Sequence, residues 1–65
     1  MVRVGDREVP WREGMTIADL LREMDDHYPY PVVRIGDRHV SRRDFSKVKV
    51  PRNSEVFLIH LIAGG

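Results

Sequence analysis

Apolar and polar residues alternate in two short segments at the start of the chain. Val2-Arg3-Val4 and Arg7-Glu8-Val9 flank the dipeptide Gly5-Asp6, which is typical of a tight turn between paired strands. Pro10 has no backbone N–H, so it ends the second strand or places that strand at a sheet edge. The pattern predicts a β-hairpin over residues 2–9, followed by Trp11 as an anchor in the core or at its rim.

The next segment has the spacing of an amphipathic helix. Its apolar stripe consists of Ile17, Leu20, Leu21 and Met24. Thr16 is a favourable N-cap, and Asp19 three residues later approximates a capping box. Pro29 and Pro31 predict that the helix ends near His27. With one apolar face, this helix is expected to pack on something flat.

A second hairpin is predicted after the helix. Val33-Arg34-Ile35 and Arg38-His39-Val40 flank Gly36-Asp37, so that IGDRHV at 35–40 nearly repeats VGDREV at 4–9. Two hairpins that use the same turn chemistry explain this near-repeat.

The rest of the chain predicts an irregular connection and one more strand. Residues 41–49 are expected to be irregular, with Phe45 and Val48 in the core, and residues 51–54 form a turn. Residues 56–62 are a continuous apolar strand, typical of the middle of a sheet with both faces covered. The predicted fold class is therefore α+β, a small mixed sheet covered on one face by one main helix.

Size and composition limit what such a chain does by itself. A chain of 65 residues is one small domain, and an enclosed pocket of about 300–1,000 Å³ would hollow out most of its core. We therefore expect a protein that is not an enzyme. The net charge of +1 is too balanced to indicate a nucleic-acid partner.

The absence of cysteine favours a reducing, cytoplasmic location and excludes a thiolate as nucleophile, zinc ligand or sulfur bearer. The longest apolar run, residues 56–63, is far shorter than a membrane span, so no membrane association is expected.

Other candidate sites lack the spacing that their chemistry needs. The residues considered were His27, His39 and His60 for a metal, Asp25 and Asp26 as paired carboxylates, Ser41, Ser46 and Ser54 as nucleophiles, and Gly5 and Gly36 as phosphate-binding glycines. No metal site and no bound cofactor are expected in this chain.

The terminal residues Ala63-Gly64-Gly65 are the remaining candidate. Two glycines make a thin peptide, and three residues beyond Ile62 reach about 10 Å. Such a tail is long enough to enter the active site of another protein, where we expect the Gly65 carboxylate to attack the α-phosphate of ATP. We expect residues 1–62 to form the folded domain and residues 63–65 a flexible C-terminal tail.

The chain resembles the ThiS/MoaD family of ubiquitin-like β-grasp sulfur carriers over essentially its whole length. The matching segments are VRVGDREVPW, TIADLLREM, VVRIGDRHVSRRDF and the terminal EVFLIHLIAGG. The last segment is the most specific, because an apolar strand that runs into AGG is the functional end in that family.

The resemblance implies a β-grasp fold and a set of partners. A ThiF-like adenylating enzyme uses ATP to activate Gly65, and a cysteine desulfurase or other sulfur donor converts it to a thiocarboxylate. Thiazole synthase (ThiG-like) takes the sulfur in thiamin biosynthesis. Gly64, Ala63 and Ile62 match the part of the tail that partners recognise, and the free carrier is expected to be a monomer.

Three other functions stay open at this point. A MoaD-like carrier would deliver sulfur to a molybdopterin precursor, and a ubiquitin-like modifier would form an isopeptide bond through Gly65. A plain β-grasp interaction module would make no use of the tail.

Overall fold

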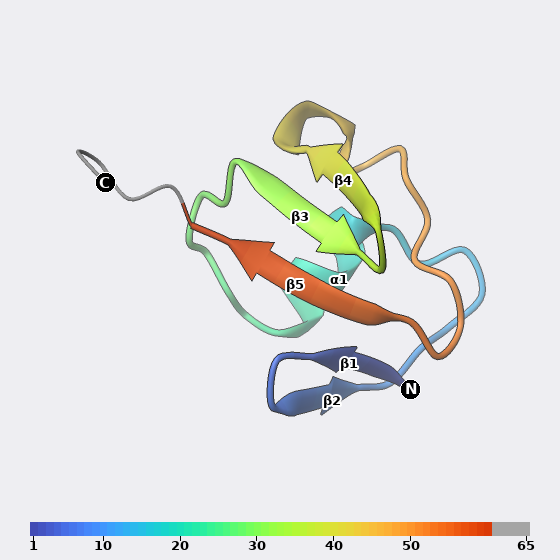
Figure 1. The fold of residues 1–65 in the computed structure, drawn as a ribbon. Coiled ribbons are helices and arrows are strands. Elements are labelled where there is room, and N and C mark those ends of the chain that lie inside the picture. Colours follow the sequence, from blue (N-terminus) through green and yellow to red (C-terminus); the bar gives the residue numbers. More distant parts are fainter. Residues whose placement is uncertain (61–65) are drawn as a thin grey trace.

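Within residues 1–60, five strands form one mixed sheet, with a single α-helix across one of its faces (Figure 1). The structure is a computed structural model and describes residues 1–60. The elements in chain order are β1 (Val2–Val4), β2 (Arg7–Val9), α1 (Ile17–Glu23), β3 (Val32–Ile35), β4 (Arg38–Ser41), the 3₁₀ turn η1 (Arg42–Asp44) and β5 (Glu55–Ile59).

The strand order is β2-β1-β5-β3-β4, so the last strand lies in the middle of the sheet. β5 runs parallel to β1 and antiparallel to β3. This is β-grasp topology, and it confirms the predicted α+β class with one helix on one face of a small mixed sheet. β2 lies at an edge and ends at Val9, as expected from Pro10.

Both predicted hairpins are present, and both have two-residue loops. Val4 pairs with Arg7 in the first hairpin, and Ile35 pairs with Arg38 in the second. Gly5 and Gly36 open the two turns with φ of 62° and 56°, a left-handed conformation that glycine adopts without a steric penalty. The near-repeat in the sequence is therefore a repeated turn.

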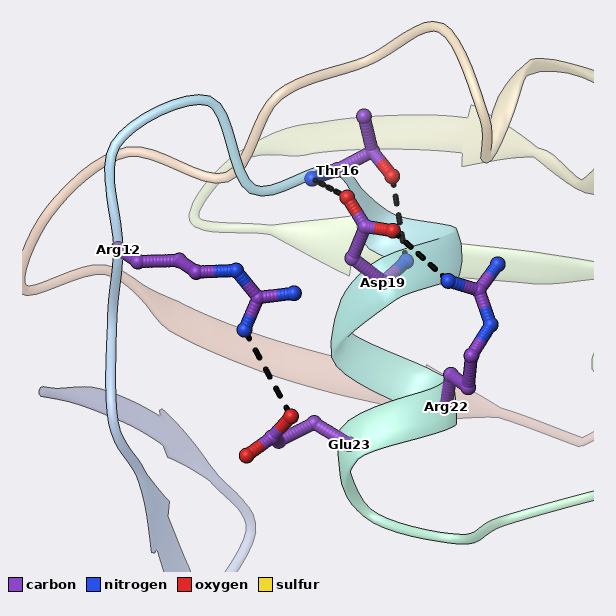
Figure 2. A network of polar contacts seen from close by, with 5 residues as sticks. All are labelled: Arg12, Thr16, Asp19, Arg22 and Glu23. Carbon is purple, nitrogen blue, oxygen red and sulfur yellow. Dashed lines mark hydrogen bonds and ion pairs between the residues drawn. The ribbon is translucent and has the colours of Figure 1, made fainter.

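The N-terminus of α1 is held by the predicted capping box (Figure 2). The backbone N–H of Asp19 donates to Thr16 Oγ1 at 3.1 Å, and the N–H of Thr16 donates to Asp19 Oδ2 at 3.0 Å. Arg22 pairs with Asp19 at 3.1 Å, and Arg12 pairs with Glu23 at 3.6 Å. The two arginines are exposed, so these ion pairs contribute little beyond the cap.

The C-terminus of α1 differs from the prediction, because the helix ends at Glu23 and not near His27. Asp25 has φ of 57°, and its N–H donates to the carbonyl of Arg22 at 3.0 Å. The N–H of Asp26 donates to the carbonyl of Leu21 at 3.1 Å. These two bonds make a Schellman cap with aspartate in the position where glycine is usual, so the helix ends before either proline.

The core lies between α1 and the covered face of the sheet. Its buried apolar side chains are Val2, Val4, Val9, Met15, Ile17, Leu20, Met24, Tyr30, Val33, Val40, Phe45, Val50 and Val56. Phe45 is in the core and Val48 packs against it, both as predicted. Trp11 also packs at the rim, where its Nε1–H donates to the Val50 carbonyl at 2.7 Å.

The last strand is shorter and less covered than predicted. β5 spans Glu55–Ile59, so His60 lies beyond it, and residues 61 and 62 lie outside the described residues. The β3–β5 ladder ends at the pair Val32–Ile59. Coverage on both faces is also wrong: Val56 is fully buried, but Phe57 is only partly buried on the face opposite α1.

Candidate functional site at the end of the central strand

The four residues predicted as the site of activation and partner recognition lie outside the described residues 1–60. They are Ile62, Ala63, Gly64 and Gly65. The structure describes the strand that precedes them in the sequence and the side chains around its end.

β5 is paired unequally along its two sides. On one side, β3 pairs with it from Val56 to Ile59. On the other, β1 pairs only with Glu55 and Val56. The second half of β5 is therefore bonded to the rest of the sheet through β3 alone.

Three aromatic side chains meet where β5 ends. The ring centroids of Tyr28 and Tyr30 are 4.7 Å apart, and those of Tyr28 and His60 are 4.8 Å apart. Tyr30 and His60 are separated by 5.1 Å in an edge-on arrangement. Tyr28 is 47% exposed, so the cluster presents an aromatic surface beside the last described residue.

Asp26, which follows the C-terminus of α1, is hydrogen-bonded to both tyrosines of this cluster. Its Oδ2 accepts from the Tyr30 hydroxyl at 2.7 Å, and its Oδ1 accepts from the Tyr28 N–H at 3.1 Å. These two bonds, with that from Tyr30 the larger cause, lower the pKa of the Asp26 carboxyl. The same bond to Asp26 raises the pKa of Tyr30 to about 12. The tyrosine thus stays protonated and the carboxyl ionised over the neutral range.

The uncovered face of the sheet carries one arginine packed on an aromatic ring. The guanidinium carbon of Arg34 lies 4.1 Å from the centroid of Phe57, its cross-strand neighbour. Arg34 Nε is buried and has no hydrogen-bond partner among the described residues.

The structure keeps the other sequence candidates apart. His27 contacts Asp25 at 2.9 Å, His39 lies on β4, and His60 belongs to the aromatic cluster. Among residues 1–60, no three His, Cys, Asp or Glu side chains gather as a metal ion would require. Over the same range, no helix is both long enough and apolar enough to cross a membrane.

The aromatic cluster is the feature that the sequence pattern did not reveal. The signal for it is the run Tyr28-Pro29-Tyr30-Pro31, because a residue before proline favours extended backbone. What the sequence did not show is that His60, 30 residues later than Tyr30, would pack against both rings.

No protein-family model matches this sequence, and no curated protein was found to be similar to it. The chain has a β-grasp, ubiquitin-like fold. A fold by itself assigns no activity, so function has to be argued from the site.

Proposed function

We propose that this chain is a sulfur carrier whose C-terminal Gly65 is adenylated by a partner enzyme and converted to a thiocarboxylate. The protein is a co-substrate in this proposal and not an enzyme. ATP is bound by the ThiF-like partner, and the sulfur is delivered to a ThiG-like thiazole synthase.

The observation that carries the proposal is the place of β5. This strand is the central one of the sheet, and the sequence continues from it through Ile62 and Ala63 to Gly64 and Gly65. β5 is paired on both sides at Val56 and on its β3 side as far as Ile59, so the strand that precedes the predicted tail in the sequence is anchored in the sheet. Neither Gly64 nor Gly65 adds a side chain that would obstruct a narrow channel.

The chemistry needs only the carboxylate from this chain. A Gly65 carboxylate oxygen attacks the α-phosphorus of ATP, and pyrophosphate leaves. A hydrosulfide sulfur then attacks the Gly65 carbonyl carbon, and AMP leaves with the bridging oxygen. One oxygen is thereby replaced by sulfur, with no change in the oxidation state of the carbon. Where a cysteine desulfurase presents the sulfur as a persulfide, a thiol reduces the resulting acyl disulfide.

The test is intact mass spectrometry of the 65-residue chain after incubation with a ThiF-class enzyme, ATP and sulfide. We expect the mass increase of one sulfur in place of one oxygen, located at Gly65 by fragmentation. An isopeptide-linked product would contradict the carrier and support a protein modifier. If no enzyme of this class changed the mass in an ATP-dependent way, only a role as an interaction module would remain.

A single added alanine supplies the matched control. Placed after Gly65, it moves the carboxylate away from the diglycine and should abolish the mass change. Placed before Met1, it should leave the mass change intact. If both extended proteins acquired sulfur equally, the assignment to Gly65 would be wrong.

A further inference from the structure

Residues 42–52, here called the basic segment, carry an excess of positive charge. Of the 11 basic and 10 acidic residues of the chain, the segment holds five and one, so its net charge is +4 and that of the rest of the chain is −3. All five cations are exposed. They are Arg42, Arg43, Lys47, Lys49 and Arg52, and the one carboxylate is that of Asp44.

The backbone of the basic segment is fixed to the start of α1 and to the connection before it. The N–H of Ile17 donates to the Val48 carbonyl at 3.1 Å, and the N–H of Val50 donates to the Met15 carbonyl at 2.7 Å. Phe45 and Val50 are buried in the core. Figure 1 shows the chain from η1 to β5 passing along the side of the molecule where β5 begins. The cations are therefore carried by a backbone that is ordered before any partner arrives, which lowers the entropic cost of binding.

The two lysines of the segment face the solvent because their apolar neighbours face the core. Val48 packs against the core and Val50 is buried, whereas Lys47 and Lys49 are exposed. The backbone of Lys49 is held by a bridge to Thr16. The alternation of these four residues thus sets both ammonium groups on the outside of an ordered stretch of chain.

Arg52 is positioned by an aromatic ring. Its guanidinium carbon lies 4.8 Å from the ring centroid of Trp11. That ring is itself fixed, since its Nε1–H donates to the Val50 carbonyl at 2.7 Å. Stacking uses the face of the guanidinium and leaves its N–H groups able to bind a carboxylate.

The positive charge of the segment is not neutralised within residues 1–60. No carboxylate of this part of the chain forms an ion pair with any of the five cations. Asp19, on the helix that the segment packs against, is bonded to Thr16 and Arg22 instead. Even if the exposed Glu13 and Glu55 are counted with the segment, these two carboxylates lower its net charge only from +4 to +2. The surface is therefore complementary to an anionic partner.

We propose that the basic segment is a docking surface for an acidic region of a partner protein. Asp and Glu side chains of the partner pair with Lys47, Lys49 and the arginines of the segment. A protein surface with a local cluster of carboxylates fits better than a nucleic acid. A nucleic acid carries charge along its whole length, so it would also lie against the rest of the chain, whose net charge is −3. The proposal is independent of sulfur transfer.

A capped octaglutamate peptide is the probe for binding. It is titrated into the isotopically labelled full chain at an ionic strength of about 0.15 M, where screening limits the reach of each charge to about 8 Å. The amide resonances within residues 42–52 should shift with a dissociation constant below about 1 mM. If these resonances showed no saturable shift, or if a capped octalysine peptide shifted them equally, the proposal would fail.

Two double variants separate a local surface from the net charge of the chain. Lys47→Gln with Lys49→Gln removes two charges from the basic segment, and Arg7→Gln with Arg38→Gln removes two exposed charges from the hairpins. Both variants should keep the amide spectrum of the folded chain, because all four side chains are exposed. The lysine variant should weaken octaglutamate binding at least about fivefold, and the arginine variant less than about twofold. Equal weakening would overturn the proposal, since net charge alone would then account for binding.

Two further outcomes would overturn the proposal by assigning the segment to another occupant. Tighter binding of a single-stranded oligonucleotide with the same number of negative charges as octaglutamate would indicate a nucleic acid. Shifts within residues 42–52 that depend on protein concentration, without any peptide, would indicate a second copy of the chain. No activating enzyme takes part in these measurements, so failure here is separate from failure of the sulfur-carrier assay.

Discussion

The two hairpins share a turn sequence, yet they support the central strand to different extents. Each contains Gly-Asp-Arg and a two-residue loop. The second hairpin pairs with β5 through four residues, from Ile35–Val56 to Val32–Ile59, whereas the first pairs through only two. Because β3 is antiparallel to β5, its turn lies beside the start of β5. Because β1 is parallel to β5, its turn interrupts the pairing at Val56.

The comparison shows how two similar local structures produce one closed and one open edge. The turn chemistry decides how each hairpin reverses direction. The direction of the hairpin relative to β5 decides which part of β5 lacks a neighbour. In this molecule, the part of β5 without a neighbour on its β1 side is the half that leads toward Gly65.

The largest effect is expected at Val56, where the two hairpins meet β5. Val56 is fully buried and pairs with both Val4 and Ile35. Val56→Ala removes two methyl groups and leaves a cavity, so it should lower the free energy of unfolding by about 2–3 kcal/mol. Urea denaturation followed by circular dichroism measures this. Ile59→Ala, at a partly exposed position paired only with β3, should cost about 1 kcal/mol; an equal loss would contradict the unequal support.

The two turn glycines should be equally sensitive to substitution. A Cβ at Gly5 or Gly36 meets no atom within 4 Å, so only the positive φ opposes alanine. Gly5→Ala and Gly36→Ala should each cost about 1 kcal/mol, measured by the same denaturation. A difference greater than about 0.5 kcal/mol would show that the turns are not equivalent.

Tyr30→Phe tests the polar contact beside the open half of β5. Removing the bond to Asp26 should cost about 1 kcal/mol near neutral pH. Tyr28→Phe is the control, because no hydrogen bond of the Tyr28 hydroxyl is found within residues 1–60. A comparable loss in the control would show that the effect of Tyr30→Phe does not come from the bond to Asp26.

The pH dependence of stability should change in the same variant. The pKa of Asp26 is lowered, so its contribution is present above 3.8 and is lost as the pH falls below that value. The pKa of Tyr30 is raised to about 12, so its contribution is present below pH 10.0 and is lost between 10.0 and about 12. Tyr30→Phe should make the free energy of unfolding depend less on pH in both the acidic and the alkaline range. If the dependence in the acidic range were unchanged, Tyr30 would not lower the pKa of Asp26.

The smallest effect is expected at Asp25, in the connection between the two hairpins. Asp25 has φ of 57°, close to that of Gly5 and Gly36, but it carries a side chain. Asp25→Gly should therefore raise the free energy of unfolding by about 0.5 kcal/mol, the opposite sign to alanine at the turns. Thermal unfolding measures the change, and a lower midpoint would show that the aspartate side chain stabilises the cap.

Much of the fold was predictable where the signal lies within a few residues. Both Gly-Asp turns and the cap at Thr16 were correctly predicted, because each depends on contacts between near neighbours. The C-terminus of α1 was not, since Asp25 takes a conformation that usually signals glycine. The predicted tail, with Gly64 and Gly65, lies outside the described residues and stays a prediction.

The sequence by itself determined the two hairpins, the helix start, the α+β class and most positions of the core, because hydrophobic period and turn chemistry are local properties. Only the tertiary structure decided where β5 ends, which of its sides is open, and that His60 meets Tyr28 and Tyr30. The physical reason is that the extent of a β-ladder depends on the direction and length of both strands. That information is shared between segments far apart in the chain.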